Sequence, residues 1–174
     1  MFGDTTDLAE NKLLLLYIFN RIKLPISNNQ ITQIVLENNF INYFTLHQYI
    51  SELLTSGFLE YIAEDKKHRL LITEKGSRVL TMFENRLSKN KAQVLDAYLD
   101  KHLDNIKKEI TVSAEYTIEN KDNYIVNLIT KENNKVLMDL KINVSTNKQA
   151  QELCKKWKNS SSEMYEKILH FLMD

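Results

Sequence analysis

Residues 43–62 read YFTLHQYISELLTSGFLEYI, and this stretch decides the fold of the N-terminal half. Thr45-Leu46-His47-Gln48 forms a capping box, in which each end of the motif accepts a hydrogen bond from the backbone N–H of the other, so a helix is predicted to begin there. Gly57 is predicted to end it, because glycine adopts the positive φ of the C′ position at little cost. Phe58 to Ile62 then has the apolar and aromatic composition of a strand.

Two helices are predicted before this stretch. The first runs from a cap at Asp7 to about Arg21 and is apolar on nearly all sides, which indicates a central, buried helix. Leu24-Pro25 ends it, since the residue before a proline avoids the α region. A second capping box, Ser27 to Gln30, begins a short helix.

A hairpin and a fourth helix are predicted after it. The strands 58–62 and 69–72 are separated by the charged tip Glu64-Asp65-Lys66-Lys67, a pattern typical of an antiparallel pair. Thr73 then caps a helix that continues to Leu87. Residues 88–90 (Ser-Lys-Asn) mark the boundary between two domains, 1–88 and 89–174.

The C-terminal half is predicted to join a long helix to a small sheet. Asn90 caps a helix over 91–110, and apolar and polar residues then alternate over 112–118, 124–128 and 136–144. Strict alternation predicts an antiparallel meander with one buried face. Capping boxes beginning at Thr146 and Ser160 predict two final helices.

Composition narrows the function classes. The chain of 174 residues has 23 Lys and Arg against 23 Asp and Glu, and Cys154 is its one cysteine, which excludes an internal disulfide and suits a reducing compartment. The longest apolar run, Leu13–Phe19, is far shorter than the ~20 residues that span a bilayer. With no targeting segment evident, we expect a cytoplasmic protein without a membrane partner.

The residue pattern does not favour catalysis. The three glycines are too far apart to form a phosphate-binding loop, and the four histidines are scattered along the chain. The carboxylates form no isolated pair in an apolar setting, as general acid–base catalysis would require. We therefore expect no enzyme activity, no cofactor and no metal.

The order of elements resembles a winged helix-turn-helix domain over residues 7–87. SELLTSGFLEYI at 51–62 and RLLITEKG at 69–76 are similar to the end of the recognition helix and the second wing strand of PadR-like and MarR-like bacterial regulators. LAENKLLLLYI at 8–18 and YFTLHQYISELL at 43–54 are similar to a bacterial family that joins a winged helix to a C-terminal domain of unassigned function. The expected fold is α+β: a winged helix-turn-helix, a linking helix, and a three-stranded antiparallel meander with two helices.

This resemblance implies a transcriptional regulator that binds double-stranded DNA, with the 45–56 helix in the major groove and the 64–69 wing on the backbone. Gln48 can pair with adenine, while Ser51 and Thr55 can reach bases or phosphates. The N-terminal amides of the second helix suit a phosphate. The predicted DNA-contacting residues are Asn28, Asn29, Thr45, His47, Gln48, Ser51, Thr55, Lys66, Lys67 and Arg69.

Charge leaves a second interpretation open. Residues 1–88 hold nine Lys and Arg against ten Asp and Glu, whereas DNA-binding domains usually have a basic surface. Glu52 lies on the predicted DNA-facing side of its helix, and no Lys or Arg accompanies it. The alternative is a winged helix that binds protein and not DNA.

The 91–110 helix carries an apolar stripe at i, i+3, i+4 spacing. Because DNA readers usually work as two-fold dimers, we interpret the stripe as the seam of a homodimer. The other interpretation is that it packs on the chain's own meander. The meander and last helices then stabilise the dimer or receive an effector or protein partner. The predicted seam residues are Leu95, Tyr98, Leu99, His102 and Ile106.

Overall fold

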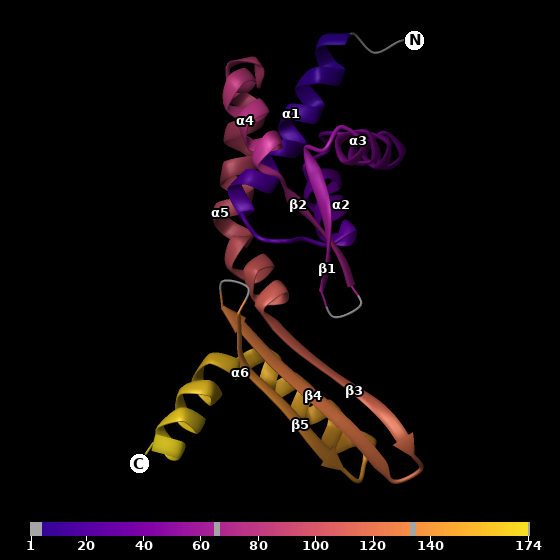
Figure 1. Cartoon of the computed structure of the whole chain (residues 1–174), viewed down its shortest axis with the longest axis vertical. Helices are drawn as coiled ribbons and strands as arrows, with labels where there is room; N and C mark the ends of the chain where they lie inside the picture. The colour runs from indigo at the N-terminus through magenta and orange to yellow at the C-terminus, as the bar shows by residue number, and fades with distance from the viewer. Residues whose placement is uncertain (1–4, 65–66, 133–134, 174) are drawn as a thin grey trace. The chain divides into compact units, whose positions relative to one another are not determined.

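The computed structural model describes residues 5–64, 67–132 and 135–173, and within these ranges it is α+β, as predicted (Figure 1). The chain divides into two compact units, Met1–Lys107 and Lys108–Asp174. The first holds α1 (Thr5–Ile22), α2 (Asn28–Glu37), α3 (Tyr43–Thr55), β1 (Leu59–Glu64), β2 (Lys67–Ile72), α4 (Glu74–Phe83), the 3-10 helix η1 (Glu84–Arg86) and most of α5 (Lys89–Thr111). The second holds β3 (Val112–Asn120), β4 (Asn123–Glu132), β5 (Lys135–Val144) and α6 (Asn147–Met173).

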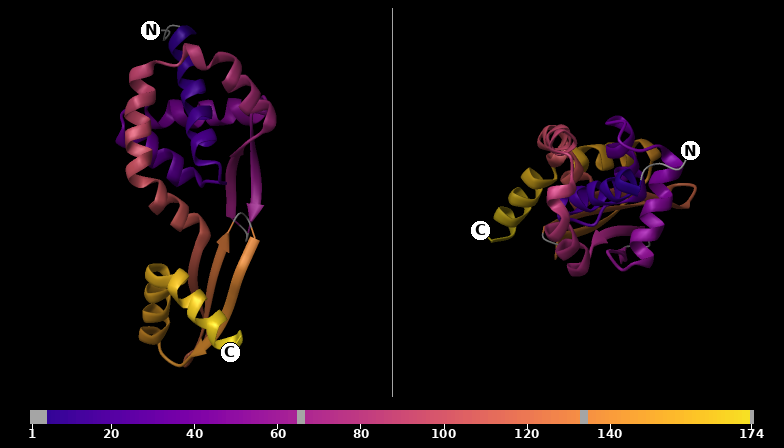
Figure 2. Two further views of the ribbon diagram at one scale, coloured as in Figure 1. Left: turned by 90° about the vertical axis from the view of Figure 1, so that its left-hand side faces the viewer. Right: turned by 90° about the horizontal axis from the view of Figure 1, so that it is seen from above.

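Helix α1 is the centre of the first unit, and Figure 2 shows it enclosed by the other helices. Leu14, Leu15 and Ile18 are completely buried, which confirms that a helix apolar on all sides is a core helix. The helix already includes Thr5, so Asp7 lies in its first turn and the predicted cap at Asp7 is wrong. It ends at Ile22, just before Leu24-Pro25, as the proline predicts.

The caps of α2 and α3 differ in how well they were predicted. The Ser27–Gln30 box is present, since Gln30 N–H donates to Ser27 Oγ (3.2 Å) and Ser27 N–H donates to Gln30 Oε1 (2.9 Å). Helix α3, however, begins at Tyr43, because the side chain of Asn42 accepts the Thr45 N–H (3.0 Å). The predicted Thr45 cap is therefore wrong, and one more turn precedes it.

The end of α3 follows the prediction, and the predicted hairpin forms with longer strands, because Glu64 and Lys67 of the predicted tip pair with each other. Gly57 has φ 71°, and the N–H groups of Gly57 and Phe58 donate to the carbonyls of Leu54 and Leu53, a Schellman motif. Strands β1 and β2 pair antiparallel from Leu59↔Ile72 outward. A bridge between Ile26 and Leu70, not predicted, ties β2 to the α1–α2 connection. The tip residues Asp65 and Lys66 lie outside the described residues.

The predicted cap of α4 is correct, and the predicted cap of α5 is wrong. Thr73 caps α4 by accepting the Gly76 N–H (3.0 Å), but η1 replaces the predicted last turn. Helix α5 begins at Lys89, and the carbonyl of Ser88 accepts the Ala92 N–H (3.0 Å), so the predicted cap at Asn90 is wrong. The two units divide near the end of α5, whereas the predicted domain boundary precedes that helix.

The second unit is the predicted meander covered on one face by α6 (Figure 1). Its strands lie in the order β3-β4-β5, all antiparallel. The core between sheet and helix is built from Ala114, Val126, Leu128, Ala150, Cys154 and Trp157. Helix α6 is kinked at Ser160 (φ −138°, ψ 27°), so the two predicted helices form one helix with a break at the predicted junction.

Candidate nucleic-acid interface

Helix α3 has one buried and one exposed side. Its buried side consists of Leu46, Tyr49, Ile50 and Leu53. At 100° per residue, four exposed residues fall within about 60° of one another on the opposite side. We call this the α3 ridge, and its members are Phe44, Gln48, Ser51 and Thr55.

Phe44 is the ridge residue that the sequence reasoning missed. Its side chain is 83% exposed, and it stands in the first turn of α3 in edge-to-face contact with the Tyr43 ring, 5.6 Å between centroids. The missed signal was Asn42, because an earlier cap brings residues 43 and 44 into the helix. The ridge therefore begins with an exposed aromatic ring and continues with polar side chains.

Gln48 is held by a chain of polar contacts that reaches α1. Its Nε2 donates to Glu52 Oε1 (3.0 Å), and Lys12 of α1 pairs with the other oxygen of the same carboxylate. Hydrogen bonds from Lys12 and Gln48 lower the pKa of Glu52, so the carboxylate stays ionised. Since Lys12 neutralises Glu52, this residue repels a phosphate less than its sequence position suggests.

Thr45 and His47 lie beside the ridge and serve local structure. Thr45 is half-buried and donates its N–H to the Asn42 cap. The half-buried His47 ring packs on Tyr43, 4.4 Å between centroids, and its Nε2 lies 3.4 Å from Thr32 Oγ1 of α2. Both residues therefore help fix the N-terminal turn of α3.

The remaining predicted DNA contacts come from other elements. Asn29 is exposed in the first turn of α2, whereas the side-chain oxygen of Asn28 is buried without a hydrogen-bond partner among the described residues. Arg69 is half-buried, and its guanidinium donates to the Pro25 carbonyl (3.5 Å). Lys66 lies outside the described residues, and only the backbone of Lys67 is described. The ridge thus brings together Gln48, Ser51 and Thr55 alone of the predicted set.

Lys75 is a cation near the C-terminal end of α3 that the sequence reasoning did not select. Its Nζ donates to the Ser56 carbonyl (2.9 Å) and lies 5.1 Å from the centre of the Phe58 ring. A cation at this end of a helix is stabilised by the helix dipole. Lys12 of α1 therefore contacts α3 at Glu52, and Lys75 of α4 contacts its C-cap, Ser56.

The apolar stripe of α5 is covered within the chain. Leu95 and Leu99 are 0% and 1% exposed. Asp96, between them, accepts hydrogen bonds from the Tyr17 hydroxyl (3.0 Å) and from Arg21 Nε (3.0 Å), both on α1.

The other predicted seam residues lie further along α5. Tyr98 donates its hydroxyl to Glu37 of α2, His102 stacks on the Tyr98 ring, and Ile106 is buried. The structure therefore ties this face to α1 and α2, which neither interpretation of the stripe anticipated. Dimerisation stays a prediction, and Tyr98 and His102 are the two predicted seam residues that are half-buried and not buried.

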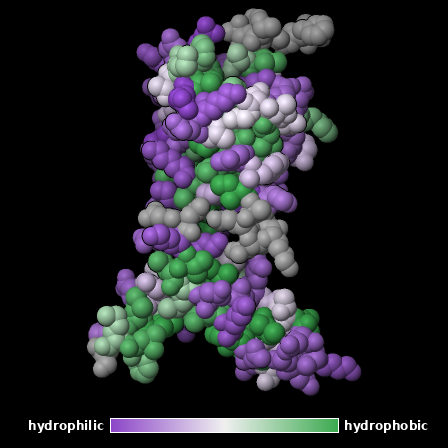
Figure 3. Space-filling view, in the orientation of Figure 1, coloured by the Kyte–Doolittle hydropathy of each residue, from purple (hydrophilic) through white to green (hydrophobic). Residues whose placement is uncertain are grey.

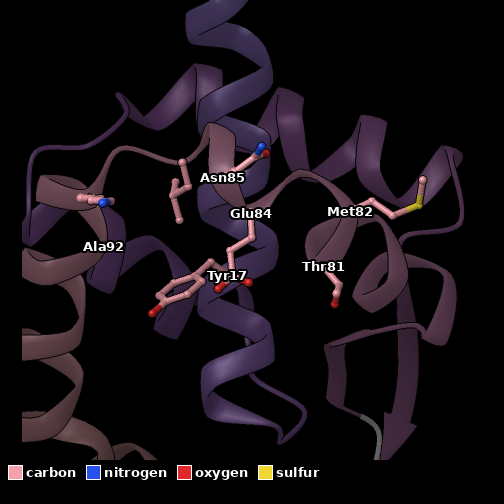
Figure 4. Close-up of a pocket in the computed structure, with 8 residues that line it drawn as sticks. Tyr17, Thr81, Met82, Glu84, Asn85 and Ala92 are labelled. Carbon is pink, nitrogen blue, oxygen red and sulfur yellow. The ribbon is translucent and has the colours of Figure 1, made fainter.

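An open hollow of about 540 Å³ lies among α1, α4, η1 and the start of α5 (Figure 4). Tyr17 lines it, and burial together with the Asp96 carboxylate raises the pKa of this phenol, so the hydroxyl stays protonated as a donor. Across 5–64, 67–132 and 135–173, no three metal-ligating side chains cluster. No helix in the same ranges has the length and apolar character needed to span a membrane.

These features define an α+β protein whose first unit joins α1–α4 and most of α5 to a hairpin, and whose second unit is an antiparallel meander covered by a kinked helix. The chain belongs to the family described as "Domain of unknown function (DUF4364)", whose model matches residues 11–172 and so extends over both units. No curated protein and no solved structure matches it.

Proposed function

We propose that the chain is a DNA-binding transcriptional regulator whose N-terminal unit is a winged helix-turn-helix, with α3 as recognition helix and β1–β2 as wing. The α3 ridge is the observation that carries this proposal. Its side chains project from a helix whose opposite side is buried in the unit's core, and a helix that enters the major groove needs this arrangement.

The attachment of the hairpin supports the proposal. The Ile26–Leu70 bridge has hydrogen bonds of 3.0 and 2.7 Å, and Arg69 donates to Pro25 in the same connection. These contacts hold β2 against the segment that leads into α2. A hairpin fixed in this way can contact a DNA backbone while α3 contacts bases.

Charge sets the expected mode of binding. The logarithm of a protein's binding constant for any duplex falls linearly with the logarithm of the salt concentration. The slope is proportional to the number of phosphates that the protein's cations neutralise. Residues 1–88 carry nine basic and ten acidic side chains. We therefore propose weak binding to random sequence and a strong dependence on base contacts from the ridge.

The C-terminal unit is proposed to contact a second copy, an effector or a protein partner. Its α6 ends in Phe171, Leu172 and Met173, which are 86%, 72% and 82% exposed. Figure 3 shows this end of α6 as an apolar area. Exposed apolar side chains that lie together are typical of interaction surfaces.

The test is binding of the full chain to random-sequence duplex DNA at low and at physiological salt, followed by selection of bound sequences. The double variant Gln48→Glu plus Ser51→Glu adds two charges to the exposed ridge and should abolish selection. Asn105→Glu, on an exposed position of α5, is the matched control and should select the same site. Enrichment of a palindrome would support a dimer.

Protein binding is the second candidate, favoured by the absence of Lys and Arg from the ridge and by the exposed Phe44 ring. The same experiment separates the two. If the chain does not bind duplex DNA even at low salt, the DNA proposal is wrong and the ridge is better interpreted as a protein contact.

A further inference from the structure

We infer that the α3 ridge selects A·T base pairs, with Gln48 reading adenine and Phe44 contacting the methyl group of a neighbouring thymine. This inference rests on the proposed DNA-binding function and names the base pairs that the surface recognises. It is carried by the hydrogen bonding of Gln48 and by the exposure of Phe44.

The contact with Glu52 fixes which atoms of Gln48 are available. An ionised carboxylate only accepts hydrogen bonds, so the Gln48 atom that faces it is the amide nitrogen. One of the two Nε2 hydrogens is therefore committed to Glu52. The other hydrogen and the oxygen Oε1 remain for a base.

The free N–H donor and the Oε1 acceptor of Gln48 are complementary to adenine and not to guanine. In the major groove adenine presents an acceptor, N7, beside a donor, the N6 amino group, whereas guanine presents two acceptors, N7 and O6. Gln48 can donate to N7 and accept from the N6 amino group at the same time. Facing guanine, its Oε1 would lie against O6 and repel it.

Lys12 makes the orientation of Gln48 persistent. It pairs with the second oxygen of Glu52 and approaches to 5.6 Å from the centre of the Tyr49 ring on the buried side of α3. The carboxylate is thus anchored to α1 and remains an acceptor for Gln48. Glu52 is a positioning residue, because it acts on the base only through Gln48.

Phe44 lies one turn before Gln48 on the same ridge. Four residues advance the helix by about 6 Å, so the two side chains are spaced to contact neighbouring base pairs. The N-terminal part of a recognition helix is the part that meets base edges. Phe44 is 83% exposed there, and the apolar group that a base edge offers to such a ring is the thymine methyl.

The first test removes only that methyl group. In the selected duplex, each thymine is replaced in turn by uracil, and binding of the full chain is measured. Wild type should bind about fourfold less tightly at one position, the effect of one buried methyl group. Phe44→Ala should bind the thymine and uracil duplexes equally. Equal discrimination by wild type and Phe44→Ala, or none by wild type at any position, would overturn the role of Phe44.

The second test replaces the contacted adenine by guanine, with cytosine opposite it. Wild type should discriminate by about tenfold or more. Glu52→Gln keeps the side-chain shape, but its amide can donate as well as accept, so Gln48 is free to turn and discrimination should fall severalfold. Glu84→Gln, on the exposed η1, is the matched control and should discriminate like wild type. Unchanged discrimination in Glu52→Gln would overturn the positioning role.

The results of these tests distinguish a failure of the A·T preference from a failure of the proposed DNA binding. Salt-sensitive binding that enriches G·C pairs at the ridge would overturn the inference and leave DNA binding standing. Failure of the wild-type chain to bind any duplex at low salt would overturn both.

Discussion

Helices α3 and α5 are both amphipathic, and the sequence suggests a partner for one side of each. On α3 the expected contact side is polar, and Gln48, Ser51 and Thr55 are exposed. On α5 the expected contact side is apolar, and Leu95 and Leu99 are completely buried within the chain. Amphipathic spacing therefore marks an exposed surface on α3 and a part of the core on α5.

The difference follows from what each helix buries. Periodicity tells which residues share a face, but it does not tell whether that face meets the same chain or another one. An apolar helix face packs against other apolar residues of the same chain when the chain folds, because its exposure to water is unfavourable. For α5 the neighbouring α1 carries Tyr17 and Arg21, which bond to Asp96 between the two leucines. An apolar stripe is therefore weaker evidence for a partner than an exposed polar ridge.

Leu99→Ala should give the largest effect on stability. Truncating a fully buried leucine removes packing and leaves a cavity, so the free energy of unfolding should fall by about 2–5 kcal/mol. Urea unfolding at several protein concentrations is the measurement. Val94→Ala, on an exposed position of the same helix, is the control and should change stability little. A loss that grows as the protein is diluted would instead place Leu99 in a dimer seam.

Asp96→Ala tests the polar contacts between α5 and α1. It leaves the half-buried Tyr17 hydroxyl without its acceptor, so unfolding should become easier by about 1–3 kcal/mol. Asp100→Ala is the matched control, since the Asp100 carboxylate lies 3.5 Å from Arg21 and its side chain is 73% exposed. Equal losses in the two variants would show that the Tyr17 contact contributes nothing beyond surface charge.

Glu10→Gln tests how the start of α5 is held, through its pH dependence. The Lys91 hydrogen bond, helped by the Ser88 N–H, lowers the pKa of Glu10. A carboxyl whose pKa is lower in the folded state contributes stability above its unfolded pKa and loses it as pH falls through the folded pKa.

Wild type should therefore be more stable than Glu10→Gln near neutral pH, by about 1 kcal/mol. The difference should shrink below about pH 4, where the unfolded carboxyl begins to bind its proton. Thermal unfolding of both proteins between pH 7 and pH 3 measures it. A gap that stays constant over this range would contradict the lowered pKa.

Three of the predicted helix boundaries are correct. Ser27, Gly57 and Thr73 were predicted correctly because each satisfies backbone groups within a few residues of itself. The three strands of the meander were predictable for a related reason, since alternation reflects the one face that α6 covers.

The errors arose where two local signals competed or where distant residues decided. Asn42 and Thr45 both could cap α3, and Asn42 prevailed, which placed Phe44 on the ridge. Nothing in the local sequence indicates the Ile26–Leu70 bridge or the contact of Arg69 with the Pro25 carbonyl, and the contact of Arg69 with DNA stays a prediction. Glu52 was judged unfavourable because its partner Lys12 lies 40 positions earlier. Such pairings depend on tertiary structure and leave no mark on local spacing.

Ser51→Ala should give the smallest effect on stability and completes the comparison of the two helices. Ser51 is exposed in the middle of α3, and alanine is the better helix former, so the free energy of unfolding should change by no more than about 0.5 kcal/mol. Urea unfolding beside Leu99→Ala measures the contrast. If Ser51→Ala destabilised the chain as Leu99→Ala does, the ridge would be part of a packed interface and could not serve as a free surface for DNA. An unchanged stability together with weaker binding of the selected duplex would instead show that α3 uses this side for recognition, while α5 uses its stripe to hold the unit together.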